Sequence, residues 1–194
     1  MIDASPVPNW ALLLATVIAI VKMQLTLLLV VMLTCMAFQL YHGYYTFEVG
    51  QYIMNLMVYG MLANLAWIFV SVFVHTLFKN YLTGFFVLLL LFIALPFLSA
   101  MGVEQNIYKF NQGPGIDYSD MDGFGYVLPF LTYRVYWLLF SIFFLTISLL
   151  LWRRGLFSGI KERWLILKSN LNPTIVAIIT ISLVGFIAMG AGIL

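Results

Sequence analysis

The chain has 194 residues, of which 64% are hydrophobic and only 8% are charged, and its formal net charge is +2. A water-soluble domain of this size needs many more ionisable side chains to cover its surface. The composition therefore excludes a soluble globular protein and predicts a protein whose solvent is lipid.

The apolar residues fall in long continuous blocks that short polar stretches separate. Each block approaches or exceeds the ~18 residues that an α-helix needs to cross the hydrocarbon of a bilayer. A strand of a transmembrane barrel would instead alternate apolar and polar residues over about ten positions. We predict an all-α fold, a polytopic integral membrane helical bundle of about five transmembrane helices, which forms a single transmembrane domain over 1–194.

The first apolar block runs from Trp10 to Tyr41 and is longer than one span requires. Lys22 interrupts it, and a lysine can reach the headgroups from the end of a helix more easily than from its middle. This predicts an interfacial approach over 10–21 and a first span over 23–40. The single cysteine, Cys35, lies inside that span, where we expect a small apolar core residue.

An aromatic-rich stretch over 42–51 follows, of the kind that settles at a membrane boundary. The remaining apolar blocks predict further spans at 56–78, 84–101, 136–152 and 174–194. Pro96 lies within the third span, where we expect it to bend the helix. The polar stretch 102–132 predicts an outer loop with or without a short helix, in which Gly123 and Gly125 are turn residues. The stretch 153–172 predicts a cytoplasmic loop.

The distribution of basic residues predicts the orientation, because cytoplasmic connections are enriched in Lys and Arg. With the N-terminus cytoplasmic and the C-terminus outside, seven of the nine basic residues lie inside and only Lys109 and Arg134 lie outside. The seven are Lys22, Lys79, Arg153, Arg154, Lys161, Arg163 and Lys168.

A search for reaction chemistry finds no Gly-rich loop ending in Gly-Lys-Ser/Thr and no His-Glu-x-x-His motif. His42 and His75 fall at opposite ends of their predicted spans, so they are not expected to share a metal, and His75 is expected to be packed or hydrogen-bonded rather than to handle protons. The acidic stretch 117–123 does not fit a calcium loop, since Tyr118 stands where the first ligand is needed. We expect no enzyme activity, no cofactor and no metal site in this chain.

Several short sequence motifs occur in an order and spacing that resemble a known family. They are Asp3-Ala-Ser-Pro-Val-Pro-Asn-Trp10, Tyr118-Ser-Asp-Met-Asp-Gly-Phe-Gly125, Tyr136-Trp137, and Leu151-Trp-Arg-Arg-Gly155 with a basic stretch after it. The ordered set, which covers nearly the whole chain, resembles the permease of a bacterial ABC-type exporter of the type-2 class, of the kind fused to a gluzincin aminopeptidase-like domain. The family usually has Asn where this chain has Asp122.

The resemblance implies that the first four spans are similar to the last four helices of a six-helix exporter half. The fifth is similar to the helix that leads outward to the peptidase-like domain, so the chain looks like a membrane fragment of such a protein. It also implies a location in the bacterial cytoplasmic (inner) membrane. The family-motif residues of the outer loop are then Tyr118, Ser119, Asp120 and Gly123.

The partners that the resemblance implies are a separate ABC ATPase subunit and a second permease half or a homodimer, with membrane lipids around them and no nucleic acid. The cytoplasmic-loop candidates for partner contact are Arg153, Arg154, Gly155, Lys161 and Arg163. The alternative is a non-transporting membrane scaffold or assembly subunit that binds other membrane helices, and the bulk features of the sequence fit it equally well. A membrane-embedded oxidoreductase or hydrolase is disfavoured, because ligand pairs and nucleophile–base sets are missing.

Overall fold

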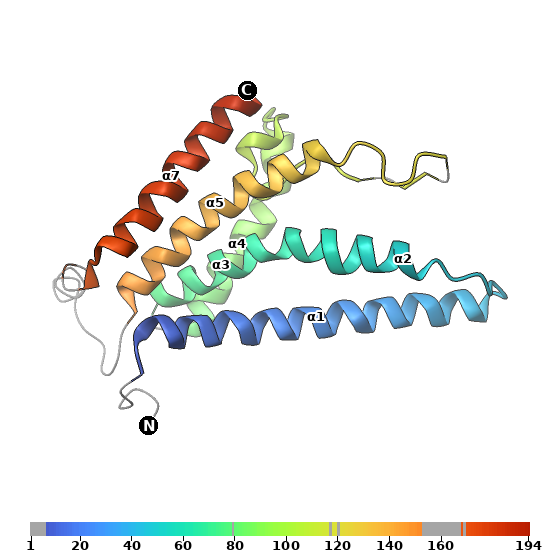
Figure 1. Cartoon of the computed structure of the whole chain (residues 1–194), viewed down its shortest axis with the longest axis horizontal. Coiled ribbons are helices and arrows are strands. Elements are labelled where there is room, and N and C mark those ends of the chain that lie inside the picture. The colour runs from blue at the N-terminus through green and yellow to red at the C-terminus, as the bar shows by residue number, and fades with distance from the viewer. Residues whose placement is uncertain (1–6, 79, 117, 120, 153–167, 169) are drawn as a thin grey trace.

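The computed structural model describes residues 7–78, 80–116, 118–119, 121–152, 168 and 170–194. These residues form an all-α protein (Figure 1). Five helical stretches among them are long and apolar enough to cross a membrane, as the sequence predicts. The number of spans and the fold class are therefore confirmed, whereas the orientation of the two termini stays a prediction.

The first span lies within one unbroken helix, α1, which runs from Asn9 to Tyr41. At ~1.5 Å per residue its 33 residues extend about 50 Å, well beyond the ~30 Å of bilayer hydrocarbon. The helix does not stop at Lys22, which is exposed, so the two predicted pieces belong to one rod. Gly43, at a φ of 77°, turns the chain back after it. Where the membrane boundary falls along α1 stays a prediction.

The second helical stretch, Val49–Leu77, begins inside the segment expected to be an aromatic boundary loop. It consists of the α-helical turn α2 (Val49–Tyr52), the π-helical segment η2 (Ile53–Gly60) and the helix α3 (Met61–Leu77). α1 and η2 contact one another, and Figure 1 shows that the later half of α1 and the α2 end of this stretch project together from the remaining helices.

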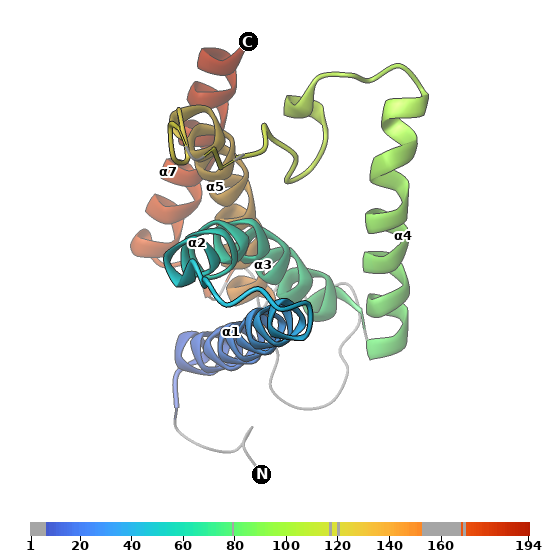
Figure 2. The same cartoon turned by 90° about the vertical axis from the view of Figure 1, so that its right-hand side faces the viewer.

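The third span is α4, which runs from Tyr81 to Ala100 through Pro96. The Asn80 side chain caps its start by accepting a hydrogen bond from the backbone N–H of Leu82 at 3.0 Å. Only one residue of α4, Gly84, is buried, and α3 is the helix that it packs against. Figure 2 shows α4 standing beside the bundle rather than within it. The helix continues through Pro96, and the bend expected there stays a prediction.

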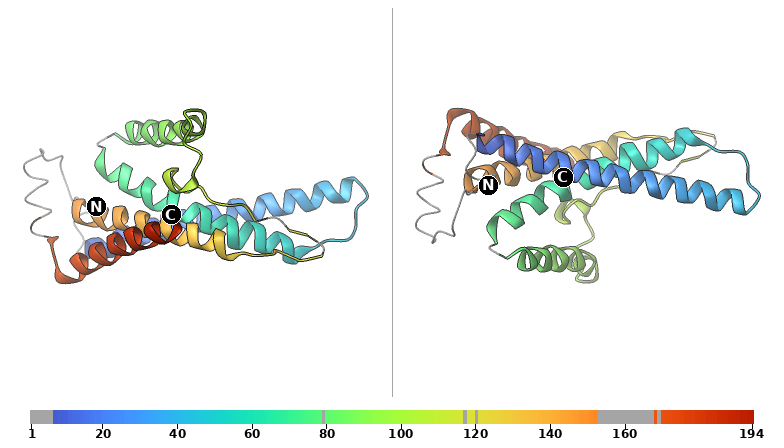
Figure 3. Two further views of the ribbon diagram at one scale, coloured as in Figure 1. Left: turned by 90° about the horizontal axis from the view of Figure 1, so that it is seen from above. Right: turned by 90° about the horizontal axis from the view of Figure 1, so that it is seen from below.

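The last two spans are α5 (Leu128–Leu151) and α7 (Pro173–Ile193), each with a proline in its first turn. α5 packs extensively on α3 and on α7, so it forms the centre of the bundle (Figure 3). Its Ser141 and Ser148 are fully buried, and their hydroxyls donate to Trp137 O and Phe144 O of the same helix. Small, internally bonded side chains let helices approach closely in a membrane.

Two apolar cores lie at different levels of α5. One joins Leu13 and Val17 of α1 to Val72 of α3, near the C-terminal end of α5. The other surrounds Tyr136 and Trp137, nearer the N-terminal end of α5. Both cores are small, because most of the apolar surface faces outward, as expected for helices that lipid surrounds.

The α4–α5 connection (residues 101–127) contains one short 3-10 helix, η3 (Asn106–Tyr108). It is shorter than the predicted loop over 102–132, because α5 already begins at Leu128. Gly123 and Gly125 adopt φ angles of 63° and 56°, a region that side chains disfavour, which confirms them as turn residues.

Candidate functional site

Ser119 and Gly123 of the family-like outer-loop motif face one another across a tight turn. The backbone N–H of Ser119 donates to Gly123 O at 2.8 Å, and the N–H of Gly123 donates to Ser119 O at 2.7 Å. Tyr118 packs edge-on against Phe124 at 5.2 Å between ring centroids, and Phe124 in turn contacts Tyr59 of η2. These contacts place the turn against η2, and Asp120 lies outside the described residues.

The cytoplasmic-loop candidates for partner contact, Arg153, Arg154, Gly155, Lys161 and Arg163, also lie outside the described residues. The two histidines are placed at the C-terminal ends of α1 and α3. His42 packs against the rings of Phe38 and Tyr41, and His75 lies against Gly84 of α4.

The prediction for Cys35 is wrong. Its side chain is exposed on the later half of α1. Hydropathy places Cys35 in a span, but it does not distinguish a side chain buried by other helices from one that faces lipid. Cys35 borders a polar cavity of about 540 Å³ that Gln39, Glu48 and Asn55 also line.

The strongest polar cluster is centred on Arg134, which the sequence marked only as an outer basic residue. Its Nη1 donates to the backbone oxygen of Asn111 at 2.8 Å and to Asn111 Oδ1 at 2.9 Å. The Asn111 amide donates to Ala63 O of α3 at 2.6 Å, and Trp137 Nε1 donates to Gln112 O at 3.1 Å. The guanidinium also lies over the Phe130 ring, 4.7 Å from its centroid.

This Arg134 cluster fixes the middle of the α4–α5 connection to both α3 and α5. Asn111 adopts a φ of 58°, which asparagine tolerates better than most residues. Beside it, Lys109 is only 8% exposed, and its Nζ donates to Glu104 O at 3.2 Å. A buried ammonium is costly unless an anion or several acceptors surround it. In the described part of the chain, a carbonyl oxygen is the partner it has.

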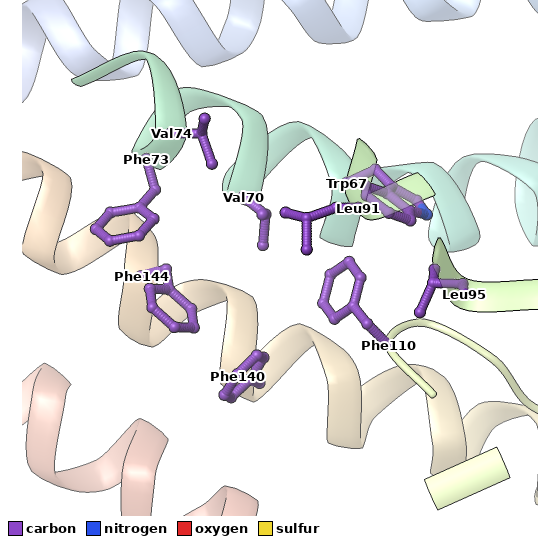
Figure 4. A pocket seen from close by; sticks show the side chains of 9 residues that line it. All are labelled: Trp67, Val70, Phe73, Val74, Leu91, Leu95, Phe110, Phe140 and Phe144. Carbon is purple, nitrogen blue, oxygen red and sulfur yellow. The ribbon is translucent and has the colours of Figure 1, made fainter. Parts of the chain in front are cut away.

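An apolar cavity of about 250 Å³ lies directly below this connection, between α3, α4 and α5 (Figure 4). Its lining contains no polar surface. The walls are formed by Trp67, Val70, Phe73 and Val74 of α3, by Leu91 and Leu95 of α4, and by Phe140 and Phe144 of α5. Phe110 of the connection closes one end, where it meets Trp67 edge-on at 4.8 Å.

α4 meets α3 at two levels beside the cavity. Near the start of α4, a Cβ on Gly84 would lie 2.7 Å from His75 Nδ1, so the imidazole of His75 occupies the space beside this glycine. Farther along, the Phe92 ring meets Trp67 of α3 edge-on at 5.7 Å between centroids, and Leu91 and Leu95 line the cavity. Most of the other α4 side chains, such as Leu90 and Phe97, are exposed.

No chemical constellation accompanies the cavity. Among the residues that the structure describes, no group of three His, Cys, Asp or Glu side chains could hold a metal ion. The arrangement can accommodate an apolar molecule and can change shape if α4 moves. No family model matches the chain, and no curated protein and no solved structure matches it significantly.

Proposed function

We propose that this chain is a membrane-spanning permease component of an ATP-driven exporter, which works with a separate nucleotide-binding subunit in the bacterial cytoplasmic membrane. The proposal is supported by the ordered sequence motifs that resemble the exporter family and by the five apolar helices. A permease of this kind contributes moving helices, and the chemistry of ATP hydrolysis belongs to its partner.

The observation that carries the proposal is the uneven packing of α4. A transport cycle requires helices that exchange neighbours, which is possible only for elements that are not held on all sides. α4 meets α3 at Gly84 and through the Phe92–Trp67 ring contact and is otherwise largely exposed, whereas α5 is packed by both α3 and α7. The α4 side of the molecule is therefore the part suited to move.

The second permease half follows from the same surfaces. Five helices with many bulky, exposed side chains make a thin bundle. A transport path needs a partner surface, which a second copy or a related half would supply. A candidate cargo is not defined by the apolar cavity, since it contains no orienting polar group.

The alternative is a membrane scaffold, and the projecting α1–α2 hairpin favours it. The later half of α1 exposes apolar side chains such as Leu33 and Phe38 and is contacted by little besides η2. Such a surface suits the binding of another membrane helix with or without transport.

The two functions are separated by purification of the tagged chain from native membranes in mild detergent, followed by mass spectrometry. A permease component retains an ABC ATPase subunit. Recovery of other membrane subunits without any ATPase would instead support the scaffold.

A further inference from the structure

We propose that the apolar cavity between α3, α4 and α5 binds an acyl chain of a bilayer lipid. This proposal does not depend on the exporter function, because it requires only that the helices span a bilayer.

The apolar lining of the cavity favours a hydrocarbon ligand. A cavity without polar surface gives water no hydrogen-bond partner, and apolar cavities of about 150 Å³ stay dry and bind benzene. The cavity here is larger, about 250 Å³, and therefore accommodates more hydrocarbon than one ring. Any ligand with a polar group at this level would lose hydrogen bonds to water without replacement.

The position of the cavity indicates that the hydrocarbon ligand comes from a membrane lipid. Its walls come from the middle of three helices that are each long and apolar enough to cross the membrane, so it lies at the depth of acyl chains. α4, which forms one wall, leaves Leu90 and Phe97 exposed. A chain can therefore enter sideways from the bilayer, between α4 and its neighbours.

The test uses Trp67, which lines the cavity, as a reporter. The full chain is reconstituted in phospholipid bilayers that contain a phospholipid brominated in the middle of its acyl chains, which quenches nearby tryptophans. The Trp67 signal is the difference between the wild type and Trp67→Phe. We expect strong quenching that Val70→Phe, which fills the cavity from α3, reduces by at least half. Leu91→Phe fills the same space from α4 and should act alike.

The matched control is Val184→Phe, the same substitution at an exposed position of α7, which should leave the quenching unchanged. Absence of Trp67 quenching in the wild type would overturn the proposal, because a second protein helix or an empty cavity would then be indicated. Equal quenching in Val70→Phe, Leu91→Phe and Val184→Phe would also overturn it, since lipid would then be reaching Trp67 from outside the cavity.

Discussion

Arg134 and Asn111 are joined by two hydrogen bonds from a single nitrogen. Nη1 of Arg134 donates to the backbone oxygen of Asn111 at 2.8 Å and to its side-chain Oδ1 at 2.9 Å, across 23 residues of sequence. Because the Asn111 amide also donates to Ala63 O, the pair links α5, the α4–α5 connection and α3.

We expect Arg134→Met to loosen this connection. The substitution leaves two acceptors of Asn111 without their donor, which lowers the free energy of unfolding by about 1–3 kcal/mol. The thermal unfolding midpoint in detergent should fall, and trypsin should cleave after the normally buried Lys109 at a higher rate. An unchanged cleavage rate would show that other contacts hold the connection.

Two substitutions at Asn111 distinguish the contribution of its backbone conformation to stability from that of its side-chain hydrogen bonds. Asn111→Gly keeps access to the observed φ of 58° but removes the hydrogen bonds of the amide, whereas Asn111→Ala loses both. A left-handed alanine costs roughly 1–2 kcal/mol. The thermal midpoint should therefore fall more for alanine than for glycine, and the reverse order would contradict the assigned role of the backbone.

The α3–α4 contact should depend on the absence of a side chain at position 84. Gly84→Ala places a Cβ where His75 Nδ1 lies, so the imidazole or α4 has to move, at a cost of about 1–3 kcal/mol. His75→Ala should restore stability in the double variant. Unfolding of the four proteins measures the coupling, and additive effects would show that the two residues do not compete for one space.

A similar contact holds α7 on α5. A Cβ on Gly190 would lie 3.1 Å from the Tyr136 ring, which stacks on Phe186 at 4.4 Å between centroids. Gly190→Leu should therefore lower the thermal midpoint markedly. Gly192→Leu is the control, because open space surrounds that position. Equal effects of the two leucines would contradict this packing.

The predicted orientation can be read from labelling of single cysteines in a Cys35→Ala background. Ser119→Cys, in the α4–α5 connection, should react with a membrane-impermeant maleimide added to intact cells. Ser158→Cys, in the basic stretch that follows α5 in sequence, should react only after the membrane is permeabilised. The opposite pattern would reverse the inside-outside assignment that the seven basic residues suggest.

The five spans could be predicted from sequence because hydropathy and length decide whether a helix can cross a membrane. Helix boundaries were less predictable: α5 begins at Leu128, although Thr132 and Arg134 give its first turns a polar character. Arg134 is accommodated there because Asn111 supplies acceptors, a pairing over 23 residues that no local pattern reveals.

The apolar cavity was also beyond the sequence. Leu91, Val70 and Phe140 look like any other apolar residues of a span, and whether they face lipid, a neighbour or a void depends on how α4 packs against α3. The π-helical turns of η2 are a further example, since Ile53–Gly60 carries no recognised sequence signal for that geometry. The sequence pattern predicts each helix, whereas the apolar cavity depends on the distances between helices.

The proposal of an exporter component is tested most directly by the ATPase turnover of the purified assembly. The chain and the ATPase that copurifies with it are reconstituted in proteoliposomes, and ATP hydrolysis is compared with that of the ATPase subunit alone. We predict that hydrolysis rises when the chain is present and falls when a short bifunctional maleimide joins α4 to α3 through Leu91→Cys and Val70→Cys in the Cys35→Ala background. Hydrolysis that is indifferent to both the chain and the cross-link would contradict the exporter function and favour the scaffold.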